Sequence, residues 1–242
     1  MGERTKIGWT DATFNAWWGC EKVSEGCKFC YAEILAARFE TNMWGPNGFR
    51  KFFGEAHWQK PLLWNRKAQK SGVPTKVFCA SMSDFLEART ELDAVRKQTL
   101  DLIEKTPWLI WQVLTKRPEN ISKLLPEILP PNLWLGTTAE NQKRWDERVH
   151  ILMQSAARIK FVSAEPLLGP IVFPKTEIPD WIIVGGESGR TPRPMDAAWV
   201  TSLRDQCRLH GVPFFFKQWG GTNKLLAGNL LEGEIWEEFP KF

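Results

Sequence analysis

From about residue 75 onward the sequence repeats one arrangement: a short apolar run, a polar cluster and a stretch that favours a helix. The apolar runs are rich in β-branched or aromatic residues, as strands buried on both faces of a parallel sheet are. They lie at 76–80, 108–114, 133–135, 159–162, 181–184 and 212–216. The helical stretches lie near 91–105, 118–127, 141–156 and 196–210. Alternation of this kind implies right-handed crossovers and a parallel sheet.

With an opening strand near Lys6–Trp9, the repeat predicts about six or seven βα units. The expected fold class is therefore α/β, a partial TIM-type barrel. No linker or low-complexity tract interrupts the repeat, and 242 residues is an ordinary length for one such domain, so we expect a single domain over 1–242. Residues 41–61 fit no βα unit and are expected to form an inserted lid or substrate loop, and 221–242 a C-terminal extension.

The composition excludes several classes of protein. Hydrophobic residues make up 43% and charged residues 25%, which is typical of a globular protein. No apolar stretch approaches the roughly 18 residues that span a bilayer, and the first residues lack the apolar core of a signal peptide. We therefore expect a cytoplasmic protein without a membrane partner. In that compartment cysteines more often bind metal than form disulfides.

Three of the five cysteines, Cys20, Cys27 and Cys30, lie close together near the start of the chain. Three thiolates without a nearby fourth ligand suit a [4Fe–4S] cluster with one open iron, which can bind S-adenosylmethionine. The alternative is a structural zinc ion with a remote fourth ligand such as His57. Phe29 favours the cluster, because an aromatic ring beside the last cysteine can shield a cluster and approach an adenine. The motif also joins the first strand to an amphipathic helix expected at Tyr31–Glu40.

Polar residues follow each expected strand, at the edge where an α/β barrel carries its chemistry. They are Ser81, Ser83 and Asp84; Thr115, Lys116 and Arg117; 136–141, including Thr137; Ser163 and Glu165; 185–190, including Gly185, Gly186, Glu187 and Arg190; and Lys217, Gln218 and Trp219. We expect them to ring one shared site. The glycine-rich stretch 185–189 lacks the spacing of a dinucleotide fingerprint, and three histidines in the whole chain argue against histidine-based hydrolysis.

Charge and aromatic content permit a nucleic-acid partner. The net charge is only +4, yet the chain holds 14 Trp and 15 Phe against a single Tyr. Many of these rings belong to the core, and such a surplus also leaves some available to stack on bases.

Several stretches give the chain a resemblance to a known family. They are 9–15, 26–33, 81–84, 112–118, 165–169, 185–189 and 215–220. The chain is similar to a phage-associated radical S-adenosylmethionine family, long described as of unknown function and distantly similar to spore photoproduct lyase. In the wider superfamily three residues separate the first two cysteines, whereas six separate Cys20 from Cys27.

This resemblance implies a barrel of the radical S-adenosylmethionine type, with a [4Fe–4S] cluster on the three cysteines and an electron donor of the flavodoxin or ferredoxin type. It implies cleavage of S-adenosylmethionine to a 5′-deoxyadenosyl radical that abstracts hydrogen from a substrate. The cofactor-binding positions would be Phe29, Ser81, Ser83, Asp84, Lys116, Thr137, Ser163, Glu165, Gly185 and Gly186. The substrate-binding positions would be Arg117, Glu187, Arg190, Lys217, Gln218 and Trp219.

Within that site the resemblance also implies individual roles. Ser81, Ser83 and Asp84 match the place that binds the methionine amine, and Thr137 suits the ribose hydroxyls. Ser163 and Glu165 suit the ribose or the carboxylate, and Lys116 and Arg117 the cofactor carboxylate or a substrate anion. Gly185 and Gly186 would let the backbone approach the adenine.

The expected substrate is a modified thymine base in phage DNA, rearranged during thymidine hypermodification in the host cytoplasm. The base would leave the stack or be met in a single strand. Candidate phosphate contacts are Arg50, Lys51, Lys60, Arg66, Lys67 and Lys70, which would otherwise form a solvated basic face. Two alternatives stay open: the same radical chemistry on a free nucleotide or small metabolite, and a zinc-stabilised nucleic-acid-binding module without catalysis.

Overall fold

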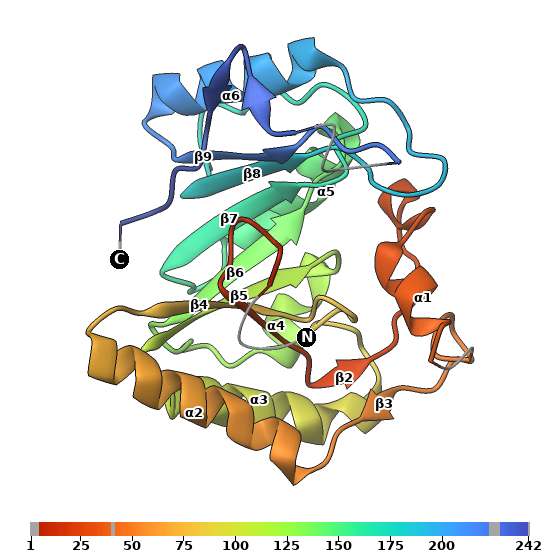
Figure 1. Cartoon of the computed structure of the whole chain (residues 1–242), viewed down its shortest axis with the longest axis vertical. Helices are drawn as coiled ribbons and strands as arrows, with labels where there is room; N and C mark the ends of the chain where they lie inside the picture. The colour runs from red at the N-terminus through yellow and green to blue at the C-terminus, as the bar shows by residue number, and fades with distance from the viewer. Residues whose placement is uncertain (1–4, 40–41, 223–227, 242) are drawn as a thin grey trace. The chain divides into compact units, whose positions relative to one another are not determined.

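The computed structural model describes residues 5–39, 42–222 and 228–241. Figure 1 shows the chain coloured by residue number, and the chain divides into two compact units. The first unit comprises 1–23, 32–135 and 156–158, and the second comprises 24–31, 136–155 and 159–242. Within the described ranges, no helix is both long enough and apolar enough to cross a membrane.

The main sheet has seven strands in the order β1-β4-β5-β6-β7-β8-β9. These strands are β1 (Ala12–Phe14), β4 (Thr75–Cys79), β5 (Leu109–Thr115), β6 (Leu133–Thr138), β7 (Ile159–Ala164), β8 (Trp181–Gly185) and β9 (Phe214–Gln218). Pairing is parallel from β1 to β4 to β5 in the first unit and from β7 to β8 to β9 in the second. Strands that follow one another lie side by side, as in an α/β barrel. The expected class, a partial barrel of parallel βα units, is confirmed at this level.

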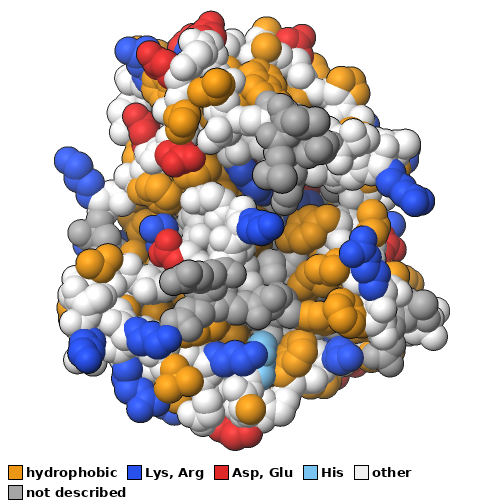
Figure 2. Space-filling model, in the orientation of Figure 1, with side chains coloured by type: hydrophobic (Ala, Val, Ile, Leu, Met, Phe, Trp, Pro, Cys, Tyr) orange, Lys and Arg blue, Asp and Glu red, His pale blue; other side chains and the backbone are white. Residues whose placement is uncertain are grey.

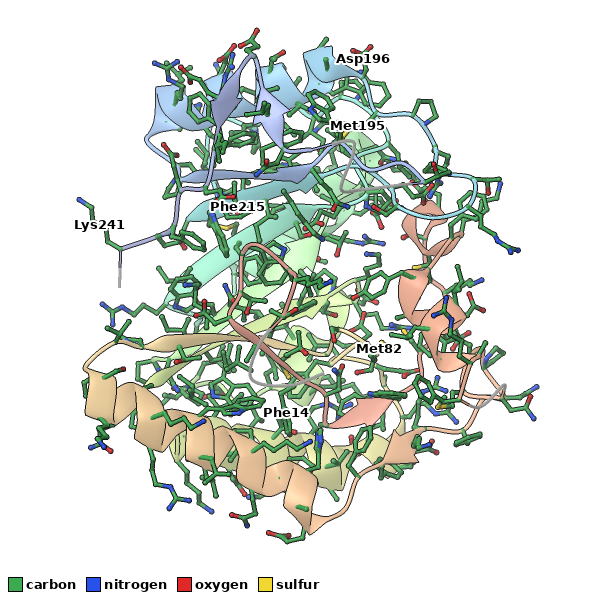
Figure 3. All side chains as sticks on the ribbon, viewed as in Figure 1. Phe14, Met82, Met195, Asp196, Phe215 and Lys241 are labelled. Atoms are coloured by element: carbon green, nitrogen blue, oxygen red, sulfur yellow. The ribbon has the colours of Figure 1, made fainter. Side chains whose placement is uncertain are left out.

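In the first unit, α2 (Glu55–Ser71) and α3 (Asp93–Glu104) lie along one face of the strands (Figure 1). Phe14 at the end of β1 fixes α2 there, because its ring packs 5.4 Å from Trp58 of α2 and 5.5 Å from Trp111 of β5 (Figure 3). The shorter elements are β2 (Trp17–Trp18), α1 (Tyr31–Ala36), β3 (Lys51–Phe52), the 3₁₀ turns η2 (Thr90–Leu92) and η3 (Pro118–Asn120), and α4 (Ile121–Leu124). β2 and β3 pair as a small antiparallel ribbon.

The second unit holds α5 (Gln142–Met153) and α6 (Ala197–His210), together with the 3₁₀ turn η1 (Glu25–Cys27). Both helices begin at a side-chain cap: Asn141 accepts a hydrogen bond from Arg144 N, and Asp196 from Ala198 N. Gly211 ends α6 with a φ of +66°, a left-handed conformation that glycine adopts without strain. β10 (Leu230–Leu231) and β11 (Glu234–Ile235) form an antiparallel hairpin within the expected C-terminal extension.

Two expected elements are wrong in position. The opening strand is not Lys6–Trp9 but β1, because Ile7–Thr10 close a turn in which Thr10 N donates to the Ile7 carbonyl at 3.3 Å. Pairing with β4 starts only at Ala12. The helix expected over 118–127 is the η3 turn followed by one turn of α4, and Leu125 is already extended. Pro126 is the physical reason, since the residue before a proline avoids helical conformation.

The segments around the cysteines also differ from expectation. α1 ends at Ala36, earlier than the helix expected over 31–40, whose last residue lies outside the described part. The expected insertion over 41–61 begins at a residue outside the described part, and its last residues belong to α2. That helix is the crossover from β1 to β4. Pro61 inside it interrupts the pattern by which a helix is recognised from sequence.

Candidate functional site

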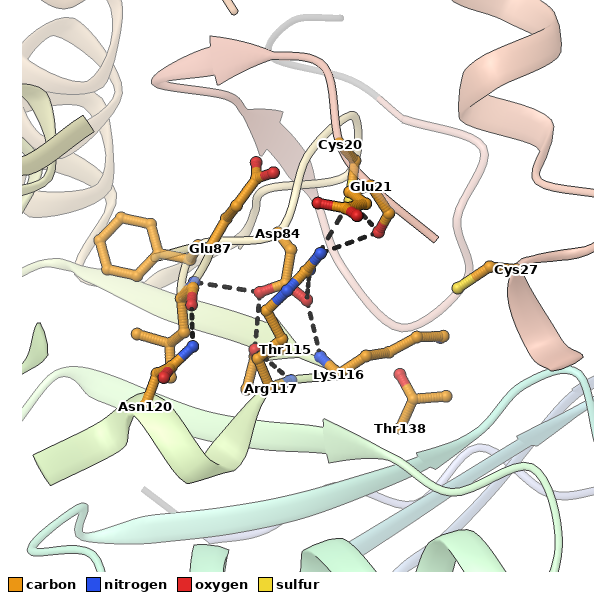
Figure 4. Close-up of polar contacts among 12 residues, drawn as sticks. Cys20, Glu21, Cys27, Asp84, Glu87, Thr115, Lys116, Arg117, Asn120 and Thr138 are labelled. Carbon is orange, nitrogen blue, oxygen red and sulfur yellow. Dashed lines mark hydrogen bonds and ion pairs between the residues drawn. The ribbon is translucent and has the colours of Figure 1, made fainter. Parts of the chain in front are cut away.

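In the first unit the residues after β4 and β5 are joined through the buried carboxylate of Asp84 (Figure 4). Its Oδ1 accepts hydrogen bonds from Thr115 Oγ1 at 2.6 Å and from Leu86 N at 3.0 Å. Its Oδ2 accepts from Lys116 N at 2.8 Å and pairs with Arg117 Nη1 at 3.1 Å. Four protein donors therefore occupy this carboxylate, which makes Asp84 the link between two strand ends.

The two serines before Asp84 have different surroundings. Asn15, directly after β1, donates from Nδ2 to Ser81 Oγ at 2.9 Å and accepts from Met82 N at 2.7 Å. The Oγ of Ser83, in contrast, is buried and has no hydrogen-bond partner among the residues that the structure describes. A buried hydroxyl without a protein partner is uncommon, and a water molecule or a ligand group can satisfy it.

Arg117 connects Asp84 with the first cysteine. Its Nη1 lies 3.9 Å from the Sγ of Cys20, and its Nη2 donates to the Glu21 carbonyl at 2.8 Å. Burial, helped by the Asp84 carboxylate and opposed by the Arg117 guanidinium, raises the pKa of the Cys20 thiol to about 12. The backbone of Cys20 is held as well, since its carbonyl accepts from Gly45 N at 2.9 Å.

In the second unit the loop that carries Cys27 and Cys30 is held by the end of β6. Ser24 Oγ donates to the buried Glu140 at 2.7 Å and lies 3.8 Å from the Sγ of Cys27. A Cβ on Gly26 would approach Glu140 Oε1 to 2.2 Å, so only glycine lets the loop lie this close. The close contact between the loop and Glu140 therefore requires glycine at position 26.

Glu25 attaches the same loop to the start of α5. Its carboxylate accepts from Asn141 Nδ2 at 2.7 Å and from Arg144 Nη2 at 2.6 Å. Hydrogen bonds from Arg144 lower the pKa of Glu25 to about 2, against the opposing effect of burial. Glu25 is therefore ionised at neutral pH, and the loop is anchored by an ion pair.

Arg193, in the segment after β8, holds the loop from another side. Its guanidinium pairs with the buried Glu187 and donates from Nη1 to the Glu25 carbonyl at 3.0 Å. It also lies 5.4 Å from the centre of the Phe29 ring, a cation–π contact. Burial of Glu187 is outweighed by the hydrogen bonds from Arg193, so the pKa of this carboxyl is lowered.

The ends of β7, β8 and β9 form a third polar cluster, also within the second unit. Glu165 forms an ion pair with Lys217 and accepts from Ser163 Oγ at 3.2 Å. Gln218 donates from Nε2 to Ser188 Oγ at 2.7 Å. The structure thus brings together Ser163, Glu165 and Lys217, three of the positions that the sequence places at strand ends.

The remaining expected positions differ from one another in burial and in contacts. Thr137 is fully buried in β6, and Arg190 is exposed. Trp219 packs its ring 4.8 Å from that of Phe216 and donates from Nε1 to the Leu230 carbonyl. A Cβ on Gly186 would lie 1.9 Å from the Trp219 carbonyl oxygen, so close packing by itself explains this glycine.

All five cysteines are free thiols, and their exposure separates them. Cys20, Cys27 and Cys30 are partly exposed, whereas Cys79 and Cys207 are buried. No group of three or more His, Cys, Asp and Glu side chains is gathered as a metal site within the described ranges. His57, weighed from the sequence as a zinc ligand, is stacked on Phe14 and Phe53, and its Nε2 lies 2.9 Å from the Asn15 carbonyl.

One basic residue was misread from the sequence. Arg50, expected as a phosphate contact or part of a solvated face, is 4% exposed and forms an ion pair with Glu87. Its Nη1 also donates to the carbonyls of Met43 and Gly48 at 3.0 and 2.8 Å. Arg50 therefore ties the segment before β3 to the loop after β4, and this correction removes it from the candidate phosphate contacts.

The structure adds functional positions that the sequence reasoning did not select. They are Asn15, which donates to Ser81, Arg193, which pairs with Glu187, and Arg144, which holds Glu25 in the cysteine loop. Glu140, in contrast, lies within the strand-end stretch 136–141 that the sequence indicated. Asn15 directly follows β1, so its place after a strand was a usable signal. Arg193 had no such signal, since it lies in the irregular segment between β8 and α6.

These features define an α/β protein with a parallel sheet, polar clusters at the carboxyl ends of its strands and a tethered loop of partly exposed cysteines. The sequence matches the profile of the DUF5131 family, described as "Protein of unknown function", over residues 4–240, and the chain belongs to this family. No curated protein and no solved structure matches it significantly.

Proposed function

We propose that this chain is a radical S-adenosylmethionine enzyme whose Cys20, Cys27 and Cys30 hold a [4Fe–4S] cluster. The donor set supports the proposal: these are the partly exposed thiols of the chain, and sulfur ligands without nitrogen or oxygen suit an iron–sulfur cluster. When bound, the cluster would supply the electron that cleaves S-adenosylmethionine. The zinc alternative would have to bind the metal through Nδ1 of His57, because Nε2 lies 2.9 Å from the Asn15 carbonyl.

The unpartnered hydroxyl of Ser83 is the observation that carries the cofactor part of the proposal. Its buried Oγ would accept a hydrogen bond from the methionine amine. Asp84, with four donors already on its carboxylate, would act instead by orienting Lys116 and Arg117. Arg117 in turn would direct its guanidinium toward Cys20 and toward a carboxylate or phosphate of the ligand.

In the second unit, Ser163, Glu165 and Lys217 form a polar set suited to ribose hydroxyls or a ligand carboxylate. Phe29 would present its ring beside the last cysteine, fixed in orientation by the Arg193 guanidinium. Glu140, Glu25 and Arg193 would hold the cysteine loop in one conformation before any metal arrives. Such preorganisation reduces the entropy lost on binding the cluster.

The proposed substrate is a modified thymine base in phage DNA. Exposed cations along α2 support it: Lys60, Arg66, Lys67 and Lys70 are all exposed on that helix, and Figure 2 shows Lys and Arg side chains over this part of the surface. Binding to DNA should weaken steeply with salt, because each neutralised phosphate releases counterions. A free nucleotide as substrate would not show that steep dependence.

Anaerobic reconstitution with iron and sulfide tests the reaction class. The expected result is a brown protein that yields 5′-deoxyadenosine from S-adenosylmethionine and dithionite. Alanine at Cys20, Cys27 or Cys30 should abolish both colour and product, whereas Cys79→Ala and Cys207→Ala should retain them. A colourless protein with one zinc ion per chain and no product would refute the proposal. Nucleoside digests of modified phage DNA after incubation then test the substrate.

A further inference from the structure

A cavity of about 410 Å³ opens in the first unit at the amino end of α2. It is lined by Phe53, His57, Lys60 and Trp64, by Thr13 of β1 and by residues 54–56. Its volume lies within the range of about 300–1,000 Å³ typical of small-molecule sites. None of the cysteines or strand-end clusters described above contributes to its wall.

The wall of the cavity is a set of aromatic rings held in fixed orientations. Phe53 stacks on His57 with ring centres 4.4 Å apart and an angle of 26° between the planes. On its other side His57 stacks on the buried Phe14 at 4.7 Å. Because packing against the core already orders these rings, the protein side chains lose little entropy when a planar ligand stacks on Phe53.

The same aromatic row continues to the surface. Phe53 meets Trp18 edge-on at 5.7 Å, and Trp18 meets Phe39 at 5.7 Å. Phe39 is 65% exposed, which is high for a phenylalanine. A strand of bases that entered the cavity would therefore find a further ring outside it.

Two polar groups complete the cavity. The Asn15 carbonyl can only accept, so the His57 nitrogen 2.9 Å from it, Nε2, carries the proton and Nδ1 keeps a lone pair. Lys60 is exposed and forms no ion pair with the residues that the structure describes. The one carboxylate on the wall, Glu55, already accepts from Gln59 Nε2 at 2.5 Å. The cavity thus offers flat rings, one acceptor nitrogen and one cation.

We propose that this cavity binds a nucleotide, with the base stacked on Phe53 and the phosphate at Lys60. The Lys60 ammonium would meet the phosphate as a point charge. The site goes beyond the proposed radical chemistry and does not depend on it. The nucleotide comes either from solution or from a single strand of nucleic acid, and the two sources differ in whether Phe39 contributes.

Calorimetric titration of the full chain without iron tests the site, so the result does not depend on the cluster. The probes are the four common deoxynucleoside monophosphates, thymidine, and a hexamer of thymidylate. Lys60→Ala should weaken binding of a monophosphate at least fivefold and leave thymidine unchanged, while Lys97→Ala at an exposed position of α3 should change neither. Ala56→Trp should fill the cavity and abolish binding of both, whereas Gln69→Trp at an exposed position of α2 should not.

Each outcome has a defined reading. A hexamer that binds at least tenfold more tightly than the monophosphate, with the gain lost in Phe39→Ser, assigns the site to a nucleic-acid strand. Equal affinities assign it to a free nucleotide. Absence of binding at millimolar concentration, or binding that survives Ala56→Trp, would overturn the proposal. Lys60→Glu repeats the test at an exposed residue if Ala56→Trp fails to fold.

Discussion

Ser24 donates a 2.7 Å hydrogen bond to Glu140, although 116 positions separate them in the sequence. Glu140 is completely buried, and its other oxygen accepts from Arg148 Nη1 at 3.0 Å. The carboxylate therefore joins the loop ahead of Cys27 to both β6 and α5. This contact explains why the loop has a defined conformation although it contains only one short 3₁₀ turn.

Gly26→Ala tests how closely the loop must approach Glu140. The added Cβ would lie 2.2 Å from Glu140 Oε1, so the loop or the carboxylate must shift. We expect a loss of about 1–3 kcal/mol in the free energy of unfolding and less than half the iron after reconstitution. Urea denaturation and iron analysis measure the two effects.

The matched control for that substitution is Gly54→Ala. Gly54 has an ordinary φ of −77°, and a Cβ there meets no atom within 4 Å. The Gly54→Ala protein should bind the same amount of iron as the wild type. Full iron content in Gly26→Ala as well would show that the position of the loop does not matter for the cysteines.

Arg193→Met should separate the role of the guanidinium from that of the side-chain stem. Methionine keeps an apolar contact with Phe29 but loses the ion pair with Glu187 and the hydrogen bond to the Glu25 carbonyl. The buried Glu187 then lacks its cation, and we expect a cost of about 1.5–3 kcal/mol in urea denaturation. Arg190→Met, at an exposed position of the same segment, should change stability by no more than about 0.5 kcal/mol.

Arg144→Gln should move the titration of Glu25. In the wild type hydrogen bonds from Arg144 lower the pKa of this carboxyl to about 2, and without them it should rise toward the ordinary value of 4.5. Carbon NMR of the Glu25 carboxyl measures the change directly. An unchanged titration would mean that Asn141 and the backbone suffice to hold the carboxylate ionised.

The lowered pKa of Glu25 also predicts how the stability of the protein depends on pH. Because the folded-state pKa is depressed, the ion pair stabilises the protein above pH 4.5, and this contribution is lost as the pH falls toward 2. The stability difference between wild type and Arg144→Gln should therefore shrink between pH 6 and pH 3. The effect should be small, since the Glu25 side chain is 36% exposed and solvent screens the pair.

Glu87→Leu should destabilise the first unit strongly. The side chains of Arg50 and Glu87 are 0% and 4% exposed, so removal of the carboxylate leaves a buried guanidinium without its anion. We expect a cost of about 3–5 kcal/mol, part of which the double variant Arg50→Met/Glu87→Leu should recover. Lys97→Met removes an exposed i,i+4 pair with Asp101 and should cost at most about 0.5 kcal/mol. If the destabilisation of the double variant equalled the sum of those of Arg50→Met and Glu87→Leu, the two residues would not act as a coupled pair.

The sequence alone determined the class of fold and the edge of the sheet that carries polar groups. Runs such as 181–184 are buried on both faces, and residues such as Glu165 follow them, because strand burial and strand ends are local properties of the chain. The start of β1 and the length of α4 were missed where a local turn and Pro126 override the apolar pattern. Local rules compete there, and the sequence does not show which prevails.

Only the tertiary structure decided which polar side chains meet. Arg50 reads in the sequence like Lys60, yet one is buried against Glu87 and the other is exposed beside a cavity. Arg193 joins Glu187, Glu25 and Phe29 from a segment without periodic pattern. The physical reason is that a charge is buried only where a distant residue supplies its partner, and that pairing depends on how the chain folds rather than on neighbours in sequence.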